Sequence, residues 1–284
     1  MIDMKNMFKK VIYWLFLKSL KSANKQRDAI LLKNKLSAIC PDLGEQYSHF
    51  EVDMDNEYLS EKIRYQHTFQ ISLAMRAVEL LTKKNKVTIG DIGDSAGTHI
   101  LYLQNLLEEK GVEIDAFSVN LDKKAIEKIQ KRGLKAIHCR AEDLHEKENM
   151  KVDIFLSFEM VEHLFNPISF LNSIAKNTDC EYFVISVPNV YRSRVGLAHI
   201  RNVKNTTKGL DAESTHIFEL SPDDWNLIFQ FSGWEIVYED RYAQYPKWHL
   251  LSLTKYLWRK FDFDGFHGVV LKKNMKFADQ YKDW

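Results

Sequence analysis

The sequence predicts an α/β protein with a doubly wound, mainly parallel seven-stranded sheet and a helical extension at its N-terminus. From residue 86 onward, strand-like segments alternate with helix-like segments, an alternation typical of the βαβ units that build a parallel sheet. The first strand candidate runs directly into a glycine-rich turn at 93–97 and then into a helix. With 284 residues, of which 45% are hydrophobic and 28% charged, the chain can bury a sizeable core.

The predicted elements of the sheet domain follow from their composition and from the residues that flank them. Seven segments read as strands: 86–93, 114–121, 135–140, 152–159, 181–187, 234–242 and 266–272. Four segments between them read as helices: 98–110, 123–131, 167–177 and 222–231. The last helix has clear start signals, because Ser221 can cap it, Pro222 suits its first position and two aspartates follow.

We expect three regions along the chain. Residues 1–40 form a basic amphipathic extension, and residues 41–85 form a helical cover whose helix, at roughly 66–82, leads into the first strand. Residues 86–284 form the main α/β domain. A longer, basic insertion at 190–215 follows the fifth strand, and such sheets bind their ligands beyond the carboxyl ends of the strands.

The N-terminal extension is strongly basic. Residues 1–40 contain nine lysines and arginines and two aspartates, a net charge of +7, so the rest of the chain carries −6. No apolar run approaches the roughly 18 residues of a membrane span. One interpretation is a helix packed against the domain or against a second copy of the chain, and the other is a helix lying on anionic lipid. Its apolar stripe consists of Phe8, Val11, Ile12, Leu15, Phe16 and Leu20.

The net charge and the cysteine content indicate which binding partners and which cellular compartment to expect. The net charge of +1 gives no general electrostatic attraction to nucleic acid. Cys40, Cys139 and Cys180 are widely separated, which is typical of a protein from a reducing compartment. We therefore expect a cytoplasmic protein, peripheral at the inner face of the membrane if the N-terminal helix binds lipid.

Polar residues stand at the carboxyl ends of five consecutive strand candidates. Because such ends meet at one edge of a parallel sheet, we expect these residues to share one crevice. The spacing of the first turn differs from the Gly-x-Gly-x-x-Gly of dinucleotide sites, which argues against NAD. The residues concerned are Asp91, Gly93, Ser95, Gly97, Asn120, Leu121, Asp122, Ala141, Glu142, Glu159, Glu162, His163 and Asn189.

Four motifs, in this order, resemble those of class I S-adenosylmethionine-dependent methyltransferases: Asp91-x-Gly93-x-Ser95-x-Gly97, Glu142-Asp143-Leu144, Glu162-His163-Leu164 with Pro167, and Val187-Pro188-Asn189. The resemblance covers residues 66–273. It implies a Rossmann-like methyltransferase fold, with 86–284 as the methyltransferase domain, 41–85 as a cover over the cofactor site, and S-adenosylmethionine as the cofactor.

The same resemblance implies a role for each cofactor-binding position. The loop from Gly93 through Ser95 to Gly97 would cradle the methionine part of the cofactor, and Asp91 would support its amino group. Asn120 would face the ribose, Ala141 and Glu142 would lie beside the adenine, and Leu121 is a further cofactor-binding position. The family usually has an acid where this chain has Asn120. An amide offers no charge-assisted hydrogen bond, so Asp122 is the residue that could compensate.

A second set of residues predicts how an acceptor hydroxyl could be activated. Glu159, Glu162 and His163 are spaced so that one helical turn would present them together, and His216 follows the insertion. Two carboxylates and two imidazoles suit Mg²⁺ or another divalent cation. The arrangement is similar to the metal site of small-RNA terminal 2′-O-methyltransferases and, in part, to ubiquinone-pathway O-methyltransferases. Two other interpretations stay open: His163 or His216 as a metal-free general base, or a structural role.

The substrate prediction rests on basic and aromatic residues. Arginines suit phosphate and aromatic faces suit a sugar or base, so we expect O-methylation of a small or carrier-linked substrate such as a nucleotide-activated sugar or a surface polysaccharide unit. An RNA 2′-O-methyltransferase and a catalytically inactive, cofactor-binding interaction protein are the alternatives. The residues are Arg192, Arg194, His199, Arg201, Lys204 and Lys208 in the insertion, then Tyr242, Tyr245, Trp248 and the segment 256–266.

Overall fold

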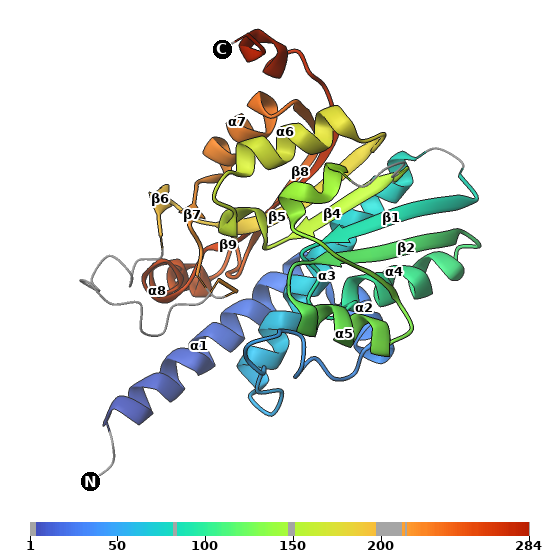
Figure 1. Ribbon diagram of the computed structural model, residues 1–284. Coiled ribbons are helices and arrows are strands. Elements are labelled where there is room, and N and C mark those ends of the chain that lie inside the picture. The colour runs from blue at the N-terminus through green and yellow to red at the C-terminus, as the bar shows by residue number, and fades with distance from the viewer. Residues whose placement is uncertain (1–3, 82–83, 147–150, 197–211, 214, 284) are drawn as a thin grey trace.

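The computed structural model describes residues 4–81, 84–146, 151–196, 212–213 and 215–283. One large sheet has the strand order β3-β2-β1-β4-β5-β9-β8, with helices on both faces (Figure 1). Its strands are β1 (Lys86–Ile92), β2 (Glu113–Asn120), β3 (Lys135–His138), β4 (Ile154–Phe158), β5 (Tyr182–Asn189), β8 (Trp234–Ala243) and β9 (Gly265–Lys273). The strands β1 to β5 are parallel, whereas β9 is antiparallel to both of its neighbours. The predicted doubly wound, mainly parallel seven-stranded sheet is confirmed.

The described residues also form eight α-helices and a small second sheet. The helices are α1 (Met4–Gln26), α2 (Ile30–Ile39), α3 (Glu57–Leu80), α4 (Thr98–Glu108), α5 (Lys123–Lys131), α6 (Pro167–Asn177), α7 (Pro222–Phe231) and α8 (Lys255–Phe261). Short 3₁₀ turns include η1 (Ala141–Glu146), η2 (Val161–His163) and η4 (Leu250–Thr254). The short strands β6 (Arg194–Val195) and β7 (Phe218–Glu219) pair antiparallel after β5.

Each face of the large sheet carries its own apolar core. The central strand β4 is buried along its whole length, so its alternate side chains supply both cores. One core lies against α3 and α4 and includes Ile71 and Leu103. The other lies against α6 and α7 and includes Phe170 and Trp225. Because helices cover both faces, polar residues can gather at the ends of the strands.

Side-chain caps explain why three helices have the predicted bounds. The side chains of Asp122, Asn166 and Ser221 each accept a hydrogen bond from a backbone N–H in the first turn of α5, α6 and α7. The predicted start of the cover helix was wrong: α3 begins at Glu57, where Asn56 accepts from two free backbone N–H groups. The polar stretch before residue 66 lacks the apolar periodicity from which the start of a helix can be predicted.

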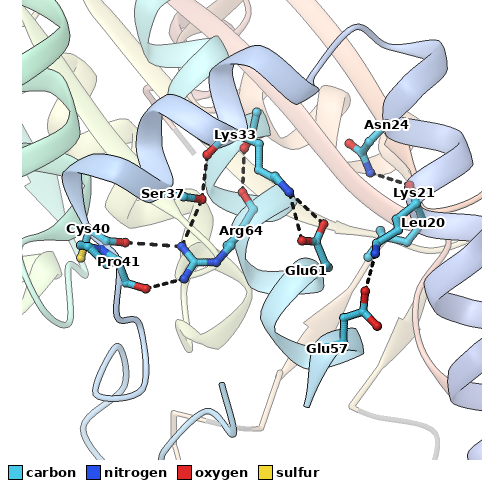
Figure 2. A network of polar contacts seen from close by, with 11 residues as sticks. Leu20, Lys21, Asn24, Lys33, Ser37, Cys40, Pro41, Glu57, Glu61 and Arg64 are labelled. Atoms are coloured by element: carbon cyan, nitrogen blue, oxygen red, sulfur yellow. Dashed lines mark hydrogen bonds and ion pairs between the residues drawn. The ribbon is translucent and has the colours of Figure 1, made fainter. Parts of the chain in front are cut away.

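The N-terminal helices pack on the domain. Phe16 and Leu20 of the predicted stripe are buried, whereas Val11 is exposed. Figure 2 shows the ion pairs and hydrogen bonds that join this region to α3. Lys33 on α2 lies 3.0 Å from Glu61 on α3, and Arg64 on α3 donates a hydrogen bond to Ser37 on α2. No described helix combines the length and hydropathy needed to cross a bilayer.

Candidate functional site

A cavity of about 460 Å³ opens at the carboxyl ends of β1, β2 and β4. Residues 46–49 of the predicted cover and residues 212–213 of the predicted insertion contribute to its walls. Seven of the eight residues predicted to bind the cofactor line this cavity, and Gly97 does not. The seven are Asp91, Gly93, Ser95, Asn120, Leu121, Ala141 and Glu142.

The turn after β1 is organised by Asp94, which the sequence analysis did not single out. One carboxylate oxygen of Asp94 accepts from the backbone N–H of Ala96 (3.1 Å) and of Gly97 (2.8 Å), and the other accepts from Ser118 (2.6 Å). An aspartate that bonds its own chain two residues on is a local turn signal that the sequence does carry. Gly97 lies beside Leu134, which a Cβ at this position would approach to 2.5 Å.

Both polar atoms of the Asn120 side-chain amide form hydrogen bonds within the protein. Its Nδ2 donates to the Asp94 carbonyl (2.9 Å), and its Oδ1 accepts from the backbone N–H of Asp122 (2.8 Å). An aspartate at this position could not donate the first bond. Asp122 then presents a buried carboxylate oxygen that accepts no hydrogen bond from the described residues and lies 3.4 Å from His49 Nε2. The acidic group on this wall of the cavity is therefore two residues later than in the family pattern.

A chain of hydrogen bonds crosses the floor of the cavity. Asp91 lies 3.1 Å from His99 Nδ1, and His99 Nε2 lies 3.1 Å from the Gln70 carbonyl oxygen. The Gln70 amide donates to Ser186 (3.3 Å), and Ser186 donates to Glu159 (2.8 Å). The chain thus joins the predicted cofactor side at β1 to the predicted acceptor side at β4. His99 and Gln70 were missed because only the packing of α3 against α4 brings them together.

The directions of these hydrogen bonds leave one proton to be shared between Asp91 and His99. Gln70 presents its oxygen to His99, so Nε2 of the imidazole carries a hydrogen. Burial, and then the neighbouring Asp94, raise the pKa of Asp91 to about 6. Burial lowers the pKa of His99, but the Asp91 carboxylate outweighs burial and leaves it raised. Near neutral pH, the pair therefore carries a proton that a cation in the cavity would displace.

Three of the four residues predicted to bind metal converge beside the cavity. The Nε2 atoms of His163 and His216 each lie 3.9 Å from the same oxygen of Glu162. Glu162 is fully buried, and neither of its carboxylate oxygens accepts a hydrogen bond from the described residues. Burial, and then Glu159, raise the pKa of Glu162 well above its usual range. This carboxylate therefore requires a proton or a metal ion to be stable.

Each histidine of this cluster is oriented through its other nitrogen. Nδ1 of His163 lies 3.0 Å from the Thr215 carbonyl oxygen, and Nδ1 of His216 lies 3.3 Å from a Glu219 oxygen. Both acceptors favour a hydrogen on Nδ1, so both Nε2 lone pairs point toward Glu162. Arg194 in turn pairs with Glu219. An imidazole whose outer nitrogen is held by a carbonyl or carboxylate is the usual arrangement of a metal ligand.

Glu159, the fourth residue of the predicted metal set, is held outside this cluster. It donates no ligand atom to the group within 4.8 Å that Glu162, His163 and His216 form. Its backbone has a φ of +52°, unusual for a residue with a side chain, and its carboxylate accepts from Ser186 while lining the cavity. Burial raises the pKa of Glu159 to about 8. Glu159 thus faces the cavity as a group able to hold a proton near neutral pH.

The residues predicted to bind substrate are mostly elsewhere. Among the aromatic ones, only Phe263 approaches the site, stacking on His216 with ring centroids 5.4 Å apart. Tyr242 is buried in the apolar core, and Trp248 is exposed on the surface. Arg194 pairs with Glu219. Residues 197–211 and 214 of the insertion, with His199, Arg201, Lys204 and Lys208, lie outside the described residues.

Comparisons with known proteins identify the fold. No protein-family model and no curated protein matches the sequence. The crystal structure of the cyclase SpnF superposes with a TM-score of 0.52 at 11% identity, covering 89% of this chain and 96% of that one. A chain from the Haloferax volcanii complex of the Trm112 methyltransferase activator with a methyltransferase gives 0.51 at 15% identity, covering 74% and 93%. The chain has the Rossmann-like methyltransferase fold.

A shared fold leaves the reaction open. One of these two structures is described as a cyclase and the other belongs to a complex with a methyltransferase, so the same architecture serves more than one chemistry. The activity of this chain must therefore be argued from its own side chains.

Proposed function

We propose that the protein is an S-adenosylmethionine-dependent methyltransferase that methylates a hydroxyl group. The charge of the cavity carries the proposal. Its described lining has a single arginine and no lysine, against six acidic residues, of which Glu159 can hold a proton near neutral pH: Asp91, Asp94, Asp122, Glu142, Glu159 and Glu213. S-adenosylmethionine has a cationic sulfonium and an ammonium group and fits this lining, whereas the pyrophosphate of a dinucleotide does not.

The residues around the cavity fit the cofactor in several places. Asp91 can pair with its ammonium group, and the Asp122 oxygen that accepts no hydrogen bond from the described residues can accept one from a ribose hydroxyl. The turn that includes Ser95 brings backbone close to the cavity, and Leu121, Ala141 and Glu142 stand at the far wall for the adenine. When bound, the cofactor supplies an electrophilic methyl group. The protein has chiefly to align the acceptor with it.

We propose further that Glu162, His163 and His216 hold a divalent cation. Three ligand atoms that lie within 4.8 Å of one another, one of them on a fully buried carboxylate, fit a metal ion, and imidazole ligands favour Mn²⁺, Fe²⁺ or Zn²⁺ over Mg²⁺. A metal ion there would lower the pKa of an acceptor hydroxyl. Glu159, on the cavity wall, is placed to receive its proton. Without metal, His163 or His216 would serve as the base.

The acceptor we propose is a small or carrier-linked molecule, such as a nucleotide-activated sugar or a unit of a surface polysaccharide. An RNA 2′-O-methyltransferase is the second candidate, favoured by the resemblance of the Glu162, His163 and His216 cluster but not by the net charge of +1. The orientation of both histidines counts against a catalytically inactive, cofactor-binding interaction protein. Cys40, Cys139 and Cys180 form no disulfide among the described residues, which supports a cytoplasmic location.

Calorimetry with S-adenosylhomocysteine, S-adenosylmethionine and NAD tests the proposal. We expect both sulfur compounds to bind one site and NAD to show no heat. Asp122→Asn should weaken S-adenosylhomocysteine binding, whereas Asp143→Asn, outside the cavity lining, should leave it unchanged. Tight NAD binding without S-adenosylhomocysteine binding would show that the methyltransferase assignment is wrong.

A further inference from the structure

The helix α1 and the segment 245–261 together expose an unusual number of large apolar side chains. Val11 and Trp14 on α1 are exposed, as are five residues of the segment. Their relative exposures lie between 51% and 89%. We name these residues the α1–α8 face: Val11, Trp14, Trp248, Leu250, Leu253, Tyr256 and Phe261.

Buried contacts hold the two elements of this face side by side. Ser19 on α1 donates to the Gln244 carbonyl (3.1 Å) and lies 2.7 Å from the Thr254 hydroxyl. The Phe16 ring stacks on Trp258, with centroids 3.9 Å apart. Figure 1 shows α8 beside α1, with the N-terminal end of α1 projecting from the body. Because Phe16 and Ser19 point inward, the α1 residues on the opposite side point away from the protein.

Both elements are basic and contain no acidic residue. Residues 4–26 have six lysines, and residues 245–261 have Lys247, Lys255, Arg259 and Lys260. Neighbouring elements satisfy two of these charges, since Lys21 pairs with Glu57 and Arg259 pairs with Asp264. Lys10, Lys18 and Lys25 on α1, and Lys247, Lys255 and Lys260 on the segment, lie on the same two elements as the exposed tryptophan, leucine and tyrosine side chains.

We propose that the α1–α8 face docks on the surface of an anionic lipid bilayer. Lysines around exposed aromatic and leucine side chains match the anionic headgroups and the interfacial zone beneath them. A second copy of the chain fits less well, because a two-fold contact would place the same basic residues against each other. The protein would lie on the membrane without crossing it.

Docking would place the cavity near the bilayer. The backbone N–H of Asp264 donates to the carbonyl of Asn189, so the segment that carries the face ends at the carboxyl end of β5. The cavity opens at the carboxyl ends of the parallel strands, the same edge of the sheet. Resting on the proposed function, this favours an acceptor linked to a lipid carrier. Membrane binding itself does not depend on that function.

Co-sedimentation with vesicles tests the docking. We expect the full chain to bind phosphatidylserine-containing vesicles at low salt, and to bind neither those vesicles at high salt nor pure phosphatidylcholine vesicles. The double variant Lys18→Gln, Lys255→Gln should lower binding roughly 25-fold. Leu250→Ser with Leu253→Ser should also lower it, whereas Leu227→Ser, at another exposed leucine, on α7, should not.

Tryptophan emission gives a second readout. Trp225, Trp234 and Trp258 are fully buried, so a blue shift on anionic vesicles would come from Trp14 and Trp248 among the described residues. Trp14→Phe with Trp248→Phe should abolish the shift. Two results would overturn the proposal: no binding to anionic vesicles at low salt, or a dimer that the two leucine substitutions dissociate. Neither depends on whether S-adenosylhomocysteine binds, so a failure here leaves the proposed function standing.

Discussion

The imidazole of His99 lies 3.1 Å from a carboxylate oxygen of Asp91 at the floor of the cavity, and both side chains are buried. Two further titratable groups face this pair. They are Asp94 at the same strand end and His67 on α3, whose ring centroid is 4.9 Å from that of His99. Burial lowers the pKa of His67, so that residue stays neutral. The charge under the cavity therefore depends on one proton shared by Asp91 and His99.

Cofactor binding should release this proton. A ligand ammonium group beside Asp91 favours the carboxylate and disfavours imidazolium, so the complex holds fewer protons than the free protein. The dissociation constant of S-adenosylhomocysteine should fall by up to about tenfold per pH unit as the pH rises from 6 to 8. Calorimetry in buffers of different ionisation enthalpy measures the protons released. His99→Gln should abolish the release, and an unchanged proton count in this variant would contradict the assignment.

Metal binding should depend on Glu162 and not on Glu159. Glu162→Gln removes one of three converging acceptors, so the affinity for Mn²⁺ or Zn²⁺ should fall by at least the roughly 10- to 100-fold that weaker outer contacts cost. Glu159→Gln, whose carboxylate bonds Ser186 instead, should bind as the wild type does. The shift in melting temperature between samples with and without Mn²⁺ measures this difference in metal binding. Equal metal-induced shifts in the wild type and Glu162→Gln would exclude this site.

Gly93→Ala should impair cofactor binding more than stability. Gly93 has a φ of +93°, and a Cβ there would approach Met160, which lines the cavity, to 2.6 Å. Gly133→Ala is the matched control, since Gly133 has a φ of +74° and no atom within 4 Å of an added Cβ. Both variants should lose about 1–2 kcal/mol of unfolding free energy. Only Gly93→Ala should weaken S-adenosylhomocysteine binding, and equal affinities would show that Met160 yields without cost.

Acid should destabilise the protein through His267. Burial lowers the pKa of this histidine to about 4, whereas an unfolded histidine titrates near 6.5. The unfolded state therefore binds more protons between these values, and the unfolding free energy should fall as the pH drops from about 6.5 to about 4. The effect is on the order of 3 kcal/mol when complete. His267→Gln, compared with the wild type in urea unfolding at pH 5 and 7, should flatten this slope.

Leu20→Ala should destabilise the whole domain. Leu20 is fully buried in the core that also contains Ile71 and Leu103, so its truncation should cost about 2–5 kcal/mol. Leu31→Ala, at an exposed leucine of α2, should change the unfolding free energy by less than about 0.5 kcal/mol. Denaturant unfolding of the full chain makes the comparison. A small effect of Leu20→Ala would mean that α1 unfolds independently of the sheet domain.

Sequence patterns predicted best those features that depend on neighbouring residues. The helix α7 begins where Ser221 and its following aspartates predict, because an N-cap acts within one turn. The glycine-rich turn was recognised for the same reason. The start of the cover helix was predicted nine residues too late, since the cap at Asn56 precedes any apolar periodicity.

Features that depend on contacts across the fold could not be predicted. His99 looks like an ordinary residue of α4 until Gln70, 29 residues earlier, packs beside it. Asn120 looks like a weakened ribose ligand, although its amide is committed to the backbone of Asp94 and Asp122. Glu159 shares the expected spacing with Glu162, but its positive φ turns it toward Ser186.

The pairing of α1 with the C-terminal third also sets the order in which the chain can finish folding. Ser19 contacts Gln244, Thr254 and Trp258, which follow it by 225 to 239 residues. At ordinary rates of synthesis, a ribosome needs roughly 10 to 50 seconds to make the intervening chain. During that time Ser19 lacks these partners, although α3 is already available to pack against Phe16. The contacts between α1 and the C-terminal third are therefore among the last native contacts that the molecule can form.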